Sequence, residues 1–202
     1  MMSRYYKLSS SERINYLKLL YFSIIIVALS YFYLFASTTT SLADAKNVSN
    51  STEINTLFET ADTLYSQKKY NEAIKYYDKI LEINVSETDA LNHKGLSLWE
   101  LHKYNEALQY FDQILAINSS DVKALNNKGL TLLGLQKNEE AIRYFDQVLS
   151  INASDIYAIN NKAEALAEMG KNEEAISVIE KAAIDNPKDE YLQSTMAFIL
   201  AN

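Results

Sequence analysis

The feature that most constrains this chain is a sequence pattern that recurs every 34 residues. The clearest copies are KKYNEAIKYYDKILEINVS from Lys68, HKYNEALQYFDQILAINSS from His102 and QKNEEAIRYFDQVLSINAS from Gln136. A fourth copy, GKNEEAISVIEKAAIDNPK, begins at Gly170. A fixed period of about 20–50 residues predicts an array of stacked structural units.

The residues before each copy repeat with the same period, so each unit has two halves. ALNHKGLSLWEL from Ala90, ALNNKGLTLLGL from Ala124 and AINNKAEALAEM from Ala158 match closely, whereas TLFETADTLYSQ from Thr56 has diverged. Apolar residues in both halves follow helical spacing. One such stripe in a second half is Ala73, Ile74, Tyr77, Ile80 and Leu81, and one in a first half is Leu91, Gly95, Leu98 and Leu101. A single helical hairpin cannot bury these stripes, so neighbouring units must stack.

This pattern resembles the tetratricopeptide repeat, in which each unit is a pair of antiparallel helices. Small residues recur in the first helix, at Ala61, Gly95, Gly129 and Ala163. An alanine recurs early in the second helix, at Ala73, Ala107, Ala141 and Ala175, and a large residue follows four positions later, at Tyr77, Phe111, Phe145 and Ile179. The proline that ends a repeat in this family survives only as Pro187; Val85, Ser119 and Ala153 replace it elsewhere. We expect this departure to loosen the turns without changing the fold.

The resemblance implies an all-α solenoid of four repeats and a capping helix. The expected repeats are residues 54–87, 88–121, 122–155 and 156–189, and the cap is 190–202. The Asn-Lys-Gly run in the first helices is similar to prokaryotic, including archaeal, members of the family.

The N-terminal part of the chain has the features of a transmembrane helix. Residues 19–36 contain no charge, and as a helix they would cover about 27 Å, close to the thickness of the hydrocarbon layer of a bilayer. Residues 1–18 carry four basic residues and one acidic residue. This bias predicts a cytoplasmic N-terminus and an uncleaved signal anchor that places the repeats outside the membrane. Residues 37–53, rich in Ser, Thr and Asn, are expected to form a solvated tether.

A cleaved signal peptide is the alternative interpretation. Ala43-Asp44-Ala45 has the small residues that a signal peptidase accepts, so cleavage near Ala45 would release a secreted protein. The motif lies seven residues beyond the apolar run, which is itself long and aromatic for a signal peptide. These lengths favour the anchor.

Charge and composition exclude several classes of function. The chain has a formal net charge of −7, divided into +2 for residues 1–53 and −9 for residues 54–202, which argues against nucleic acid as a partner. It has no cysteine, and hence no disulfide, thiolate metal site or cysteine nucleophile. The two histidines, His93 and His102, occupy different repeat positions, whereas a metal site needs about three converging ligands. Without a catalytic motif, we expect no enzyme activity, metal or cofactor.

The resemblance also predicts where a partner binds. In this family, residues five and six of the first helices face a concave groove; here they are Asn92-His93, Asn126-Asn127 and Asn160-Asn161, with Phe58-Glu59 in the first repeat. Their amides can donate to and accept from the backbone of an extended peptide. This pattern resembles the asparagine ladder in the repeats of the O-linked N-acetylglucosamine transferase family, although no transferase domain is present. The alternative is that these asparagines only help the helices pack.

Aromatic residues are further candidates for partner contacts. Trp99, Tyr65 and Tyr157 are possible hydrophobic anchors, because aromatic side chains dominate many interfaces. The alternative is that they belong to the core between repeats.

Five Asn-x-Ser/Thr sequons are candidate glycosylation sites, at Asn47, Asn50, Asn84, Asn118 and Asn152. They would be glycan acceptors only outside the cytoplasm. The last three occupy one repeat position, where turn chemistry is an equally good explanation.

The function predicted from the sequence is a membrane-anchored scaffold that binds other proteins or extended peptides. One alternative is a cytoplasm-facing adaptor, which requires the opposite topology. Another is a targeting subunit for a separate enzyme, such as a glycosyltransferase.

Overall fold

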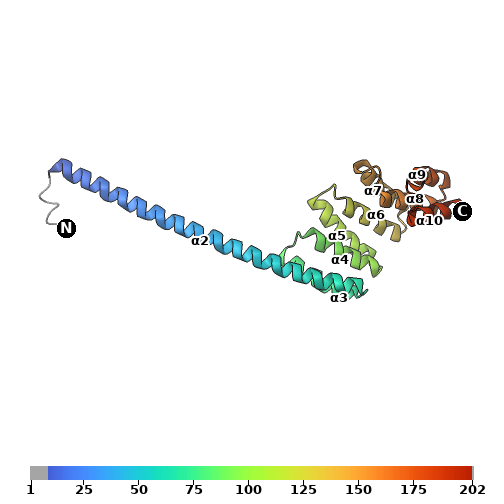
Figure 1. The fold of residues 1–202 in the computed structure, drawn as a ribbon, viewed down its shortest axis with the longest axis horizontal. Coiled ribbons are helices and arrows are strands. Elements are labelled where there is room, and N and C mark those ends of the chain that lie inside the picture. Colours follow the sequence, from blue (N-terminus) through green and yellow to red (C-terminus); the bar gives the residue numbers. More distant parts are fainter. Residues whose placement is uncertain (1–8, 202) are drawn as a thin grey trace. The chain divides into compact units, whose positions relative to one another are not determined.

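The computed structural model describes residues 9–201, except for the side chains of Ser10, Arg13, Tyr16, Leu20 and residues 36–47. The described part is helical and contains no strand (Figure 1). Its helices are α2 (Ser10–Ser66), α3 (Tyr70–Ile83), α4 (Thr88–Glu100), α5 (Tyr104–Ile117), α6 (Val122–Gly134), α7 (Asn138–Ile151), α8 (Ile156–Glu168), α9 (Asn172–Asp185) and α10 (Glu190–Ala201).

The chain divides into two units, Met1–Glu53 and Ile54–Asn202. In the second unit, the end of α2 pairs with α3, where Ala61 packs with Ala73 and Tyr77. The pairs α4/α5, α6/α7 and α8/α9 follow. Each helix packs on the next, and α10 packs on both α8 and α9 (Figure 1). The all-α solenoid of four helical hairpins with a capping helix is therefore confirmed.

Each repeat has a hydrophobic layer built around one large side chain of its second helix. Tyr77, Phe111, Phe145 and Ile179 are completely buried. The small residues of the first helices lie against them: a Cβ added to Gly95 would be 2.8 Å from Phe111, and one added to Gly129 would be 2.5 Å from Phe145. The close approach of the two helices therefore requires a small residue at this position.

The turn inside each hairpin has one conformation in all four repeats. Its central residue is left-handed, at Lys68 (φ 60°), His102 (φ 58°), Gln136 (φ 59°) and Gly170 (φ 74°). In the first copy, Lys69 N donates to Leu64 O at 2.9 Å and Lys68 N donates to Tyr65 O at 2.8 Å. These two hydrogen bonds form a Schellman motif, which satisfies the last carbonyls of the first helix. Only the fourth copy has the glycine that this conformation favours.

The turn between repeats is closed by an asparagine at the end of each second helix. In all four copies the carbonyl of this residue accepts from the backbone N–H three positions later, at 3.0–3.1 Å; the residues are Asn84, Asn118, Asn152 and Asn186. Only the last copy contains a proline, Pro187. The loosening expected where proline is missing is therefore not visible in these hydrogen bonds. Asp121 and Asp155 then cap α6 and α8 through the backbone N–H groups of Ala124 and Ala158, at 2.8 and 2.9 Å.

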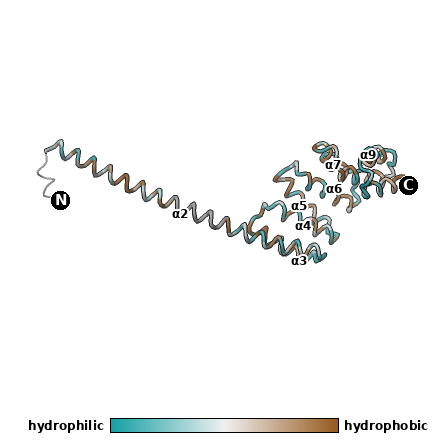
Figure 2. The backbone as a smooth tube through the Cα atoms, in the orientation of Figure 1, coloured by the Kyte–Doolittle hydropathy of each residue, from teal (hydrophilic) through white to brown (hydrophobic). Residues whose placement is uncertain are grey.

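The N-terminal unit contains the apolar stretch, which runs from Leu17 to Phe35 with a mean hydropathy of 1.9. This helix is long and apolar enough to cross a membrane, and a signal sequence has the same properties. Its described side chains are exposed, and Figure 2 colours this stretch by hydropathy. The basic residues Arg4 and Lys7, which set the predicted topology, lie outside the described residues.

The predicted tether, residues 37–53, has a helical backbone because α2 continues through it. Its composition suggested a solvated tether. It contains neither glycine nor proline, the two residues that most disfavour a helix, so the helix of the apolar stretch can continue through it.

Candidate functional site

The first helices of the repeats line the inner side of the array. Direct contacts join α4 to α6, α6 to α8 and α8 to α10, while each second helix packs mainly on the first helices beside it. In a curved stack, the elements that approach each other most closely lie on the concave side. We call the surface formed by α4, α6, α8 and α10 the first-helix groove.

The groove contains a pocket of about 390 Å³ between α6, α8 and α10. Its lining is Lys123, Asn126, Asn127, Leu130, Tyr157, Asn161 and Tyr191. Three of the predicted ladder amides therefore converge on one pocket. The side chains of Tyr157 and Tyr191 are 69% and 56% exposed, so both rings are open to a partner.

Two of these amides also connect helices. Asn127 Nδ2 donates to Asn92 Oδ1 at 2.8 Å, which joins α6 to α4. Asn126 Nδ2 lies 3.4 Å from Asp155 Oδ1, the same oxygen that caps α8. The packing role considered for the ladder is therefore real for these residues, and the groove amides are held in fixed positions by it.

Asn160 differs from its neighbour Asn161. It is 1% exposed, it does not line the pocket, and neither of its amide atoms has a hydrogen-bond partner among the described residues. Asn161, which is 6% exposed, does line the pocket. Asn160 therefore contributes no side-chain surface to the groove pocket.

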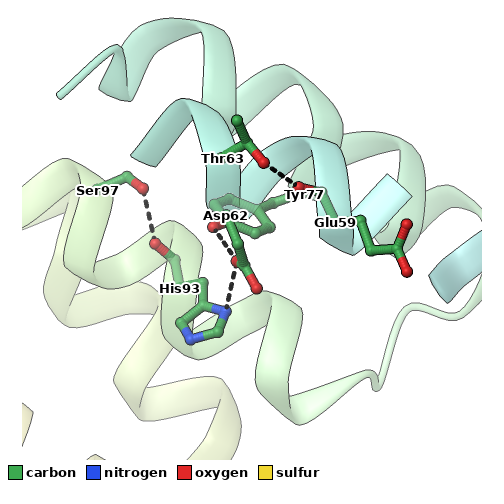
Figure 3. A network of polar contacts seen from close by, with 6 residues as sticks. All are labelled: Glu59, Asp62, Thr63, Tyr77, His93 and Ser97. Carbon is green, nitrogen blue, oxygen red and sulfur yellow. Dashed lines mark hydrogen bonds and ion pairs between the residues drawn. The ribbon is translucent and has the colours of Figure 1, made fainter. Parts of the chain in front are cut away.

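His93 lies in a polar and aromatic cluster that joins the first two repeats (Figure 3). Its Nδ1 is 3.5 Å from Asp62 Oδ1, and Tyr77 Oη donates to the same carboxylate oxygen at 2.8 Å. Burial, together with the hydrogen bond to Asp62, raises the pKa of Tyr77, so this hydroxyl keeps its proton. The ring of Phe58 packs edge-on to His93, with 6.2 Å between centroids. These contacts link α2, α3 and α4.

Two of the three predicted aromatic anchors, Trp99 and Tyr65, are half-buried against hydrophobic layers of the repeats. The ring of Trp99 packs into the hydrophobic layer of Phe111 and lies 6.3 Å from Tyr104 between centroids. Tyr65 packs on Tyr70 at 5.3 Å, and burial, followed by the nearby Glu100, raises the pKa of Tyr65 to about 12.

Tyr157 is therefore the predicted aromatic residue that reaches the groove pocket. The sequence interpretation did not include Tyr191, which lies exactly one repeat after Tyr157 and could have been found from that spacing. Lys123 lies one repeat before Tyr157 and also lines the pocket. Lys123, Tyr157 and Tyr191 are therefore equivalent residues, each the second of its repeat or of the cap.

The sequons of the repeats form turns. The side-chain oxygen of each asparagine accepts a hydrogen bond from the backbone N–H of the serine two positions later, at 3.1–3.2 Å; the pairs are Asn84 with Ser86, Asn118 with Ser120 and Asn152 with Ser154. This Asx turn agrees with the turn-chemistry explanation. Of the other two sequons, Asn50 lies in α2, and the side chain of Asn47 is outside those that the structure describes.

The two histidines lie in unrelated places. His102 is at the left-handed hairpin turn, where its Nδ1 is 2.8 Å from Tyr104 Oη. Among the described residues, no group of three or more histidines and carboxylates is placed to hold a metal ion.

Two family models described as "Tetratricopeptide repeat" match residues 92–156 and 132–198, and together they span more than half of the chain. The chain belongs to the tetratricopeptide-repeat (TPR) family. A third model, "Anaphase-promoting complex, cyclosome, subunit 3", matches residues 34–114. No curated protein sequence matches this TPR protein significantly.

Solved TPR structures resemble the array. MamA from Desulfovibrio magneticus RS-1 is 19% identical over 68% of this chain and 78% of its own, with a TM-score of 0.61. YrrB, described as a TPR protein with an unusual peptide-binding site, is 23% identical over 72% of this chain and 75% of its own, with a TM-score of 0.57. The first TPR of Spaghetti, bound to the HSP90 peptide SRMEEVD, is 25% identical over 59% of this chain and 95% of its own, with a TM-score of 0.56. The array thus has the fold of these solved structures.

Proposed function

We propose that this TPR protein is a membrane-anchored scaffold that binds an extended segment of a partner protein in the first-helix groove, on the outer face of the membrane. The observation that carries the proposal is the pocket between α6, α8 and α10. There, amides that can pair with a peptide backbone lie beside two exposed tyrosine rings.

The groove is already ordered for binding. The hydrogen bond between Asn127 and Asn92 and the contact between Asn126 and Asp155 hold amides of α6 in position without a ligand. A pre-organised surface loses less conformational entropy when a partner binds. The two peptide-related structures described above, YrrB and the Spaghetti TPR, support peptide binding as the use of this fold.

Acidic residues of α8 favour a partner segment with a basic residue. Glu164 occupies on α8 the repeat position that Leu130 occupies on α6, where Leu130 lines the pocket. Burial, and then the nearby carboxylate of Glu168, raises the pKa of Glu164. A lysine or arginine of the partner near these two carboxylates would relieve their repulsion.

Membrane attachment rests on the apolar stretch Leu17–Phe35, and the outward orientation rests on the basic residues before it. The alternatives remain a cytoplasm-facing adaptor, a targeting subunit for a separate enzyme, and a secreted form cleaved near Ala45.

Selection of binders from a random decapeptide library, with the full chain in lipid nanodiscs, tests the groove. We expect Tyr157→Ala to lower the affinity for the selected peptides about tenfold or more, as truncation of an aromatic hot spot does. We expect Asn161→Ala to lower this affinity as well. Asn160→Ala is the matched control, since this buried neighbour does not line the pocket. If the selected peptides bind the Tyr157→Ala and Asn161→Ala variants with the same affinity as the unaltered chain, the groove is not the binding site.

A further inference from the structure

The face formed by the second helices carries a repeated arrangement of three residues. Between the second and third repeats, Lys128 of α6 forms an ion pair with Asp112 of α5. The same ammonium group lies over the ring of Tyr144 of α7, 4.5 Å from its centroid. The lysine is thus held between a carboxylate on one side and an aromatic ring on the other.

The preceding repeats contain the same arrangement, one repeat earlier. Lys94 forms an ion pair with Asp78 and lies 4.4 Å from the centroid of the Tyr110 ring. Burial opposes the charge of Lys94, yet the hydrogen bonds to Asp78 and Tyr110 raise its pKa overall. In both copies the ring covers the lysine, whose side chain is 13% exposed at Lys94 and 16% exposed at Lys128.

The third copy keeps the ion pair and loses the ring. Lys162 Nζ is 2.6 Å from Asp146 Oδ1, but the residue at the position of Tyr144 is Val178. The residue before it is Ser177, where the preceding repeat has Arg143. The Lys162 side chain is 22% exposed, more than its two counterparts.

A hollow of about 680 Å³ between α7, α8 and α9 is lined by Lys162 and by Val178, the residue at the repeat position of Tyr144. Ile142, Leu166 and Val178 give it apolar walls, and Lys162, Asp146 and Ser177 give it a polar side. A second hollow, of about 390 Å³, also borders Lys162, Ser177 and Val178. Ser177 and Val178, which border both hollows, are smaller than Arg143 and Tyr144 at the same positions of the preceding repeat.

We propose that this hollow binds one aromatic side chain, a tyrosine or phenylalanine, of a partner protein. The incoming ring would lie on the Lys162 ammonium and against Val178, as the ring of Tyr144 lies on Lys128 within the chain. The Asp146–Lys162 ion pair already holds the ammonium as in the two copies that have a ring. Apolar burial and the cation–π contact both favour this occupant.

The charge around the hollow indicates what stands beside the aromatic residue. Four carboxylates and two lysines line it. Lys162 pairs with Asp146, and Lys171 lies 3.8 Å from Glu174, so Glu139 and Glu173 have no ion pair among the described residues. These two carboxylates favour a partner with lysine or arginine next to its aromatic residue. None of the residues named here lines the pocket of the first-helix groove, so the two surfaces are independent.

Ligand-observed fluorine NMR tests the proposal with the full chain in lipid nanodiscs. The probe is a capped pentapeptide, Gly-Lys-fluorotyrosine-Lys-Gly. We expect Val178→Tyr, which restores the ring of the other repeats, to raise its Kd about tenfold or more, the size of a desolvated cation–π contact. The reverse change, Arg143→Ser together with Tyr144→Val, should create a second site and increase the number of probes bound. A competing peptide with alanine in place of tyrosine should displace the probe poorly.

Equal competition by the alanine peptide, or an unchanged Kd in a folded Val178→Tyr variant, would overturn the proposal. Circular dichroism of each variant establishes that it is folded. Loss of probe binding in Tyr157→Ala would assign the probe to the first-helix groove and would also overturn it. Failure of this test would not contradict peptide binding in the first-helix groove, because peptides selected for the groove should depend on Tyr157 and not on Val178.

Discussion

A Cβ atom on Gly129 would lie 2.5 Å from Cε1 of Phe145, closer than two non-bonded carbon atoms approach in proteins. The same contact, at 2.8 Å, would arise between Gly95 and Phe111. In the fourth repeat the first-helix residue is Ala163 and the second-helix residue is the smaller Ile179. Glycine thus faces phenylalanine in the second and third repeats and alanine faces isoleucine in the fourth, whereas the first repeat combines Ala61 with Tyr77.

Gly129→Ala is expected to destabilise the array by about 1–3 kcal/mol, the usual cost of overpacking a core. The clash outweighs the gain of about 0.5–1 kcal/mol from replacing a glycine inside a helix. Thermal unfolding followed by circular dichroism measures the change. Adding Phe145→Ile should recover part of the loss, because it recreates the pair of the fourth repeat. A double variant less stable than Gly129→Ala alone would contradict this account of the pairing.

Gly170→Ala should destabilise the array by about 1 kcal/mol through its backbone alone. Gly170 has φ 74°, and a Cβ there would meet nothing within 4 Å, so no clash contributes. Gln136→Gly, at the equivalent left-handed turn, should change the stability in the opposite direction. The midpoints of urea unfolding for both variants provide the comparison. A stabilising Gly170→Ala would show that the turn conformation costs nothing.

Glu164→Gln should stabilise the protein at neutral pH. Because burial and Glu168 raise the pKa of Glu164 in the folded state, this state holds the proton more tightly than the unfolded chain does. The folded protein therefore loses stability as the pH rises from the ordinary value of 4.5 through the raised pKa, and glutamine removes that loss. At pH 7 the variant should have a higher melting temperature than the unaltered chain. At pH 3.5 the two melting temperatures should be the same. Glu180→Gln, at an exposed position, is the control.

A single cysteine placed at Lys188 reports the topology, because the chain has no cysteine of its own. Residue 188 is exposed, so Lys188→Cys should be labelled by a membrane-impermeant maleimide in intact cells if the repeats are outside. Labelling that requires broken cells would place the repeats in the cytoplasm and favour the adaptor. Recovery of labelled protein in the medium, without the membrane, would favour cleavage near Ala45.

The 34-residue period was sufficient to predict the helices, their pairing and the cap, because each contact repeats with the sequence. It was less informative about individual groove residues. Asn160 and Asn161 are the same residue type on one helix, yet the packing of neighbouring helices buries Asn160 and leaves Asn161 lining the pocket. No local sequence pattern distinguishes the two. Trp99 was offered as an anchor; it is half-buried and packs on the Phe111 layer and Tyr104, and it does not line the groove pocket.

The stack of lysine on tyrosine was also missed, although its three positions recur with the period. Lys128, Asp112 and Tyr144 lie in three different helices, and only the packed structure brings them together. The spacing of 16 residues on either side of Lys128 is not one that places residues on a common helix face.

The groove pocket takes residues from α6, α8 and α10, which belong to successive units. In such an array each unit contacts mainly its neighbours, so the stack opens most easily from an end. A peptide bound across these three helices would clamp the C-terminal end closed, and amide hydrogen exchange in α10 would slow when the groove is occupied. The partner would thus act as an additional cap, and the loss of that partner would leave the last repeat the first part of the array to unravel.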